Sequence, residues 1–356
     1  MEQKKIRYEW MDLARTLAIV SVVLCHAAES SCKQFNTYVL TEMTFSSRMF
    51  LFTCFTIGRT LGVPVFLMIT GYLLLDREYS SRDYAVFLKK RCLHLLICTW
   101  VWYAIYDVFF VFYMHVPLTP VQIAGDFLFI RPFTAGHAWY MPMILGMYLL
   151  LPLVANALHT IDTKLLTIPV IIYAAYAFGY PTLNMLAQFL FGKGLELRFN
   201  LGFSGGGYGI FIFLGYAIKK GAFRRIKIPL LAILAILSIV AAGYVQCLAF
   251  TKGHAYKLRY DFPTVLIGSL AYTELLSRIS HVRFANVFRF LACHAFGVYL
   301  SHLLFVRLFE NYIIDRDISW PLKIGGVWLV SITLAYLLVW AIGRIPKVGK
   351  YILYEK

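Results

Sequence analysis

Residues 12–26 read DLARTLAIVSVVLCH, an apolar run that carries an aspartate, an arginine and a histidine. The rest of the chain has the same apolar character, because 60% of its 356 residues are hydrophobic and only 15% are charged. Soluble domains are about 45–50% apolar and about 25% charged. So few charges cannot cover a surface that faces water. We therefore expect an all-α, polytopic integral membrane protein that contacts membrane lipids.

The number of membrane crossings follows from the apolar segments. A helix that crosses a bilayer needs about 20 predominantly apolar residues. We predict about ten transmembrane helices, at 11–30, 57–75, 90–113, 138–156, 165–180, 206–219, 228–250, 262–279, 290–310 and 323–343. The glycine-containing stretch 181–207 is expected to form a re-entrant or external loop. With no internal repeat and no long soluble block, residues 1–356 are expected to form a single transmembrane domain.

The basic residues indicate the orientation. The formal net charge is +16, and with the N-terminus placed inside, 21 of the 34 Lys and Arg residues fall in inside segments and 10 in outside segments. Cytoplasmic loops of membrane proteins are enriched in Lys and Arg. Both termini are therefore expected in the cytoplasm. The basic residues form no single patch, so no nucleic-acid partner is expected. Seven cysteines without a CxxC pair give no indication of a metal site.

The first helix carries a line of polar side chains. Arg15 and His26 are eleven residues apart, which at about 100° per residue places them on one face and roughly 16 Å apart along the axis. Asp12 joins this face. Charged groups within a membrane span are costly, so each is a candidate for function. The alternative is structural: an Asp12–Arg15 salt bridge, with His26 satisfied by a neighbouring helix.

Other polar side chains are expected at the depth of His26. A histidine there could act as a general base, because its unperturbed pKa lies near neutrality. Glu29 could orient the imidazole or could be an interfacial residue. Arg59 is expected at the outer end of the second helix, and His302 in the outer half of the ninth. His137 enters the fourth helix from outside, where an aromatic interface belt is the alternative explanation.

The order of these motifs resembles the acyltransferase family 3 membrane proteins, which O-acylate surface polysaccharides, lipopolysaccharide and related glycans. The matching motifs are Arg15 with His26 after ten residues, Gly62-Val63-Pro64-Val65-Phe66, Thr70-Gly71-Tyr72, Lys89-Lys90-Arg91, His137 with Trp139 and Tyr140, and Tyr299-Leu300-Ser301-His302. The resemblance covers nearly the whole chain, and its short form looks most like the type that acetylates enterobacterial common antigen. Val65 replaces a usual Phe and Thr70 a usual Ser.

The resemblance implies a multi-pass enzyme of the bacterial inner membrane. Its donor would be cytoplasmic acyl-CoA, in the first place acetyl-CoA, with no permanently bound cofactor. Its acceptor would be a hydroxyl of a cell-surface glycan or of its lipid-linked precursor.

The resemblance also implies roles for individual residues. Asp12 and Arg15 would bind the donor, because a guanidinium suits phosphate. His26 would be the general base or transient acyl acceptor, and Arg59 or His137 would stabilise the oxyanion. Glu29, Thr70, Trp139 and His302 would line the site.

Two other classes of function use the same residues. A transporter of a small amino acid or a glycan would use the buried polar line as its substrate path. A structural or sensing membrane protein would have no turnover. Family resemblance alone does not decide between them.

Overall fold

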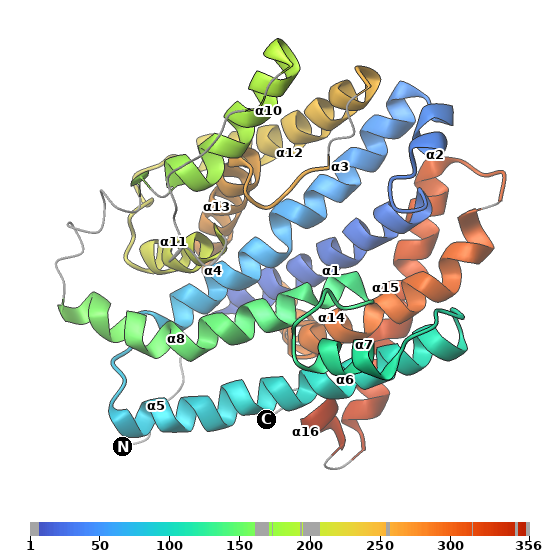
Figure 1. Cartoon of the computed structure of the whole chain (residues 1–356). Helices are drawn as coiled ribbons and strands as arrows, with labels where there is room; N and C mark the ends of the chain where they lie inside the picture. Colours follow the sequence, from blue (N-terminus) through green and yellow to red (C-terminus); the bar gives the residue numbers. More distant parts are fainter. Residues whose placement is uncertain are drawn as a thin grey trace.

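The computed structural model describes residues 7–160, 171–172, 174–192, 194, 207–253, 257–314, 316–345 and 348–353. This part of the chain is helical and contains no strand (Figure 1). The all-α prediction is therefore confirmed.

Seven helical segments in the described part are long and apolar enough to cross a membrane. They are Glu9–Ser31 (α1), Phe45–Leu74 (α3, Phe45–Leu61, and α4, Val63–Leu74), Ser81–Phe112 (α5, Ser81–Phe87, a π-turn at Leu88–Cys92, and α6, Leu93–Phe112), Gly136–Thr160 (a short 3-10 turn, Gly136–Trp139, and α8, Tyr140–Thr160), Ile228–Thr251 (α12), Ala285–Glu310 within α14 (Ala285–Ile314), and Trp320–Gly343 (α15). The polytopic membrane character is confirmed, whereas the count of ten is not.

The remaining helices are shorter. They are α2 (Thr37–Glu42), α7 (Pro120–Phe127), a π-turn at Ala175–Gly179 with α10 (Tyr180–Phe191), α11 (Gly209–Lys219), α13 (Pro263–Ser277) and α16 (Val348–Ile352). Residues 165–170 and 173 of the predicted span 165–180 lie outside the described residues. Helix α10 corrects the first part of the predicted loop 181–207, up to Phe191, while residues 193 and 195–206 of that loop lie outside the described residues. Pro181 does not prevent this helix, because a proline in the first turn of a helix loses no hydrogen bond.

The second span begins earlier than predicted. We expected it at 57–75, but α3 begins at Phe45, so Arg59 lies inside the span and not at its outer end. The first part of this helix was not predicted, because the polar residues between 46 and 53 lower the apolar character of the sequence there. One of them, Arg48, donates hydrogen bonds to the carbonyls of Leu40 and Met43 at the end of α2.

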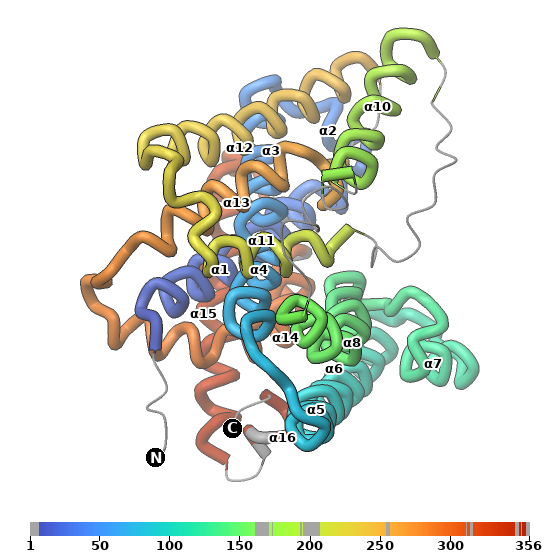
Figure 2. The backbone as a smooth tube through the Cα atoms, turned by 90° about the vertical axis from the view of Figure 1, so that its left-hand side faces the viewer, coloured from blue at the N-terminus to red at the C-terminus, as the bar shows by residue number. Residues whose placement is uncertain are grey.

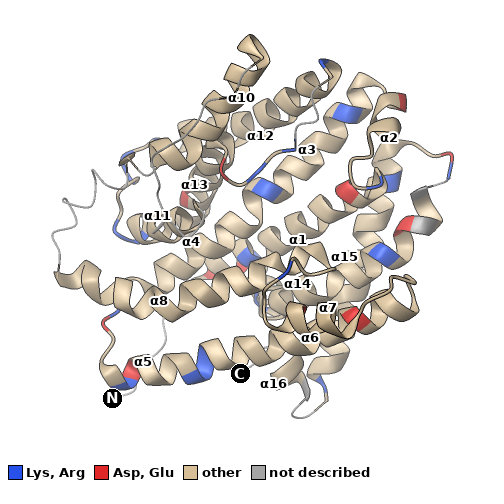
Figure 3. Cartoon of the chain, viewed as in Figure 1, with Lys and Arg blue, Asp and Glu red and all other residues tan. Residues whose placement is uncertain are grey.

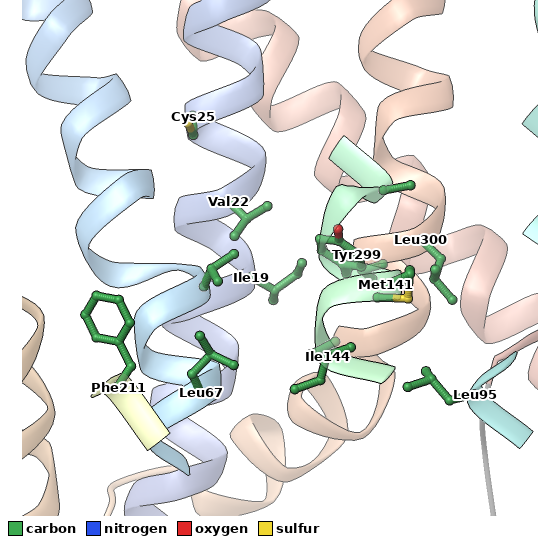
Figure 4. Packing of buried hydrophobic residues seen from close by; sticks show 14 of the residues in the cluster. Ile19, Val22, Cys25, Leu67, Leu95, Met141, Ile144, Phe211, Tyr299 and Leu300 are labelled. Carbon is green, nitrogen blue, oxygen red and sulfur yellow. The ribbon is translucent and has the colours of Figure 1, made fainter. Parts of the chain in front are cut away.

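Helix α1 lies in the middle of the bundle and contacts α3, α14 and α15 (Figures 1 and 2). Acidic residues in its first turn, Glu9 and Asp12, suit the positive end of the helix dipole. Figure 4 shows its apolar face, where Ile19 and Val22 lie near Leu67 of α4. Figure 3 shows that many of the charged residues lie toward helix ends and loops.

Helices α4 and α11 cross in backbone contact. A Cβ atom at Gly71 would lie 1.8 Å from the carbonyl oxygen of Ile212, and one at Gly215 would lie 1.8 Å from that of Met68. Only glycine fits at both positions. The Thr70-Gly71-Tyr72 motif therefore has a packing role: it fastens α4 to α11.

Candidate functional site

Three histidines from distant parts of the chain meet beside α1. The ring centroids of His26 and His302 are 5.3 Å apart, those of His137 and His302 are 5.1 Å apart, and those of His26 and His137 are 6.2 Å apart. His137 and His302 are buried, with exposures of 3% and 0%. The His26 side chain keeps 19% of its surface exposed. His26 is therefore the member of the cluster that a substrate can reach.

Neighbouring groups fix the His302 imidazole and the backbone at His137. Nδ1 of His302 lies 2.7 Å from the carbonyl oxygen of Tyr299 and 3.1 Å from that of Val298. Carbonyl oxygens only accept hydrogen bonds, so Nδ1 carries the proton and Nε2 is free. The Tyr299 hydroxyl donates to the carbonyl of His137. Within the described residues, Nε2 of His302 and both ring nitrogens of His137 have no hydrogen-bond partner.

Glu29 connects His26 to a lysine from a distant loop. Its Oε2 lies 3.5 Å from Nδ1 of His26, and its Oε1 accepts a hydrogen bond from Nζ of Lys257. Nζ of Lys257 in turn lies 5.3 Å from the ring centroid of Phe35. The structure thus places Glu29 where it can orient the imidazole. The role of Lys257 was missed in the sequence, where it was only one of the loop cations.

The turn after α1 has an unusual backbone. Lys33, Gln34 and Phe35 have φ angles of 50°, 59° and 62°. Left-handed conformations cost about 1–2 kcal/mol per residue outside glycine. Strained backbone of this kind persists only where the surrounding structure holds it. Here it places the Phe35 ring against Phe52, Phe55 and Lys257, next to Glu29.

Arg59 lies beside the cluster because α1 and α3 touch. A Cβ atom at Gly58 would lie 2.2 Å from Cβ of Cys25 and 2.4 Å from the carbonyl oxygen of Ser21. The Arg59 guanidinium carbon lies 4.9 Å from the ring centroid of Phe55 and 4.7 Å from that of Tyr260. In the part of the chain that the structure describes, no carboxylate lies within ion-pair distance of Arg59.

A cavity of about 480 Å³ opens next to Arg59. Its wall includes Arg59, Trp139, Tyr208, Lys257, Tyr260 and Asp261. Trp139 therefore lines this cavity and not the histidine cluster itself. Tyr208 and Tyr260 carry no sequence signal of their own, because aromatic residues make up 17% of the chain. Lys257 belongs both to the cavity wall and to the pairing with Glu29, so the cavity adjoins the His26 site.

The predicted donor residues lie at the other end of α1. Asp12 is buried and pairs with two arginines, Nε of Arg7 at 2.7 Å and Nη1 of Arg15 at 3.5 Å. The structural salt bridge that we considered for Asp12 and Arg15 is thus present. Because Arg7 shares the same carboxylate, the two guanidinium groups together carry one positive charge more than Asp12 balances. Phosphate groups bind such a site readily.

Thr70 does not reach the histidine cluster. Its hydroxyl donates a hydrogen bond at 3.0 Å to the carbonyl of Phe66 in its own helix. Its neighbour Ile69 packs with Ala14 and Ala18, in the first half of α1. The described residues also contain no group of three or more His, Cys, Asp and Glu residues arranged to hold a metal ion.

Comparison with known proteins gives one match. A family model described as an acyltransferase domain matches residues 8–341, which includes every site residue predicted from the sequence, from Asp12 to His302. No curated protein and no solved structure gives a significant match.

Proposed function

The chain belongs to the acyltransferase 3 family of membrane proteins, and from this premise we propose that it moves an acetyl group from cytoplasmic acetyl-CoA to a hydroxyl of a cell-surface glycan or its lipid-linked precursor. The membrane would be the inner membrane of a bacterium. The observation that carries this proposal is the position of His26. It is the accessible member of a histidine cluster, it is paired with Glu29, and it lies on the same helix as the arginine site.

In the proposed reaction, His26 removes the proton of the acceptor hydroxyl. The hydroxyl oxygen then attacks the thioester carbonyl, a C–O bond forms, and the C–S bond breaks. The CoA thiolate leaves and takes the proton back from His26. General-base catalysis of this kind contributes about 10²–10⁴ in rate. Glu29 would hold the imidazole and stabilise its protonated form, as a carboxylate does in related acyl-transfer sites.

The tetrahedral intermediate carries a negative charge on its oxygen, and this oxyanion needs a hydrogen-bond donor to stabilise it. Arg59 and His137 are the candidates, because His137 lies beside His26 and Arg59 follows Gly58, which packs against Cys25. Both have polar atoms without a hydrogen-bond partner among the described residues. A prearranged donor for such an oxyanion is worth about 10²–10³ in kcat.

The donor would enter at the end of α1 that carries Arg15. The CoA phosphates would lie near Arg7 and Arg15, and the pantetheine arm would extend along α1 toward His26, a separation of roughly 16 Å. Binding the polyanionic part of the donor far from the reacting carbon allows binding energy to position the thioester.

Acetyl transfer can be tested with purified full-length protein. We expect the protein with radiolabelled acetyl-CoA to label glycan in isolated membranes, and a deletion strain to lose the corresponding acetyl mass from its glycans. His26→Ala should abolish labelling. His281→Ala is the matched control, because His281 is 82% exposed and lies outside the site. Near-wild-type labelling by His26→Ala would remove His26 from the reaction. Uptake of an amino acid or a glycan without any acetyl transfer would instead support the transporter alternative.

A further inference from the structure

The cavity beside His26 is positively charged. Its lining includes three cations, Arg59, Lys257 and Arg259, and one carboxylate, Asp261. Asp261 is paired with Arg259 at 3.1 Å, and Lys257 is paired with Glu29. Arg59 lies over the rings of Phe55 and Tyr260, and none of the described carboxylates is within ion-pair distance of it. A desolvated cation without a partner is costly, so a bound anion would stabilise this arrangement.

The same cavity has an aromatic wall. Ring centroids of Trp139 and Tyr208 are 5.1 Å apart, those of Trp139 and Tyr260 are 5.4 Å apart, and those of Tyr208 and Tyr260 are 5.8 Å apart. All three side chains are half-buried. Burial raises the pKa of Tyr208 and of Tyr260, so both hydroxyls stay protonated and can donate hydrogen bonds. Sugar rings use their C–H faces to stack on such rings and their hydroxyls to accept such bonds.

The size and position of the cavity suit the acceptor better than the donor. Its volume of about 480 Å³ lies within the range of about 300–1,000 Å³ for small-molecule sites. An adenine nucleotide also combines rings with phosphates. However, Gly58, the neighbour of Arg59, packs against Cys25, next to His26 and about three helical turns from the Asp12–Arg15 end of α1. The acceptor hydroxyl must meet His26, so this is the place for the acceptor.

We propose that the cavity binds the acceptor sugar and that this sugar carries a negative charge, as a ring carboxylate or as a phosphate. Arg59 would bind the anion inside the cavity, which leaves His137 as the oxyanion donor, and the exposed Lys257 and Arg259 would attract the anion at the entrance. Trp139, Tyr208 and Tyr260 would hold the ring. This inference rests on the proposed function, since it names the substrate class of the same site.

Binding of three small probes to the purified full-length protein tests the charge preference. The probes are methyl glucuronide, glucose 1-phosphate and the neutral methyl glucoside, followed by saturation-transfer NMR. We expect at least one anionic probe to bind about tenfold more tightly than the neutral one, which corresponds to about 1.4 kcal/mol. The preferred anion identifies carboxylate or phosphate. Because Lys257 and Arg259 are exposed, part of the preference should decrease as salt is added.

Variants locate the preference within the cavity. Arg59→Gln should remove it, and Arg259→Gln should reduce it even if the buried Arg59 variant fails to fold. Trp139→Ala should weaken the binding of all three probes to the same extent. Lys252→Gln is the matched control, because Lys252 is an exposed cation of the same loop outside the cavity lining.

Two results would overturn the inference. Equal binding of charged and neutral probes would show that the acceptor site does not select an anion. Displacement of the probes by CoA, together with weaker CoA binding in Arg59→Gln, would assign the cavity to the donor. Acetyl transfer by the wild-type protein is measured separately, so either result can be distinguished from a failure of the proposed function.

Discussion

Glu29 makes two contacts that together define its role, one with His26 and one with Lys257. A carboxylate in this position can fix the ring of a general base and stabilise its protonated form. A structural residue at a helix end would need neither contact. At the residue scale, the pairing of Glu29 with His26 is therefore the feature whose loss should be most informative about catalysis.

We expect Glu29→Gln to lower kcat by at least about tenfold, because glutamine keeps the shape of the side chain but not the charge that stabilises an imidazolium. Radiolabelled acetyl transfer measures kcat, and calorimetry with CoA measures donor binding, which should be unchanged. Glu42→Gln, at an exposed position in α2, is the control. A variant with normal kcat would show that Glu29 is an interfacial residue.

Arg15 should serve the donor. Guanidinium binds phosphate through a fixed fork of donors that Lys cannot reproduce. Arg15→Lys should therefore weaken CoA binding by about tenfold or more, equivalent to about 1.4 kcal/mol. The melting temperature should change little, because Arg7 still pairs with Asp12. Isothermal calorimetry and thermal unfolding on the same sample separate the two effects. Normal CoA affinity in Arg15→Lys would contradict the donor assignment.

At the scale of elements, two glycine contacts set the geometry of the site. Gly58 brings α3 against α1, which places Arg59 beside the histidines. Gly71 and Gly215 bring α4 against α11, and α11 begins next to Tyr208 in the cavity wall. Small residues at helix crossings are a common means of close packing in membranes. The positions of the catalytic and binding side chains thus depend on packing contacts between glycines and neighbouring helices that take no part in the reaction.

Substituting Gly71 should destabilise the protein. In Gly71→Ala, the new Cβ atom would meet the backbone of Ile212, which cannot rotate away, so we expect a loss of about 1–3 kcal/mol or more. Gly146→Ala in α8 is the control, because no atom lies within 4 Å of its new Cβ. It should be neutral or slightly stabilising. Thermal unfolding in detergent measures both, and equal melting temperatures would show that the helices can separate without cost.

At the scale of the whole molecule, α1 begins and α15 ends on the same, lower side in Figures 1 and 2. Seven crossings alone would place these ends on opposite sides of a membrane. In the described part of the chain, the shorter helices α10, α11 and α13 are the candidates for further crossings. An even number of crossings, which the distribution of basic residues predicts, stays a prediction.

Reporter fusions test the orientation. A fusion after Lys356 and one before Met1 should both be active only as cytoplasmic reporters, because cytoplasmic loops collect Lys and Arg. Fusions within residues 195–206 should report the opposite side. A periplasmic signal from the fusion after Lys356 would show that the orientation is wrong.

The sequence by itself determined the features that depend on composition and local period. The apolar composition requires helices in lipid, and the spacing of Asp12, Arg15 and His26 places them on one face of a helix, because 3.6 residues per turn is a local property. The histidine motifs were also visible as separate candidates.

Only the tertiary structure decided how these candidates combine. It brings Lys257 to Glu29 and Tyr260 to Arg59, and it assigns Thr70-Gly71-Tyr72 to packing instead of the site. These contacts join residues far apart in the chain, and they depend on how closely whole helices approach. No local pattern contains that distance, because it is set by the side chains of both partners at each crossing.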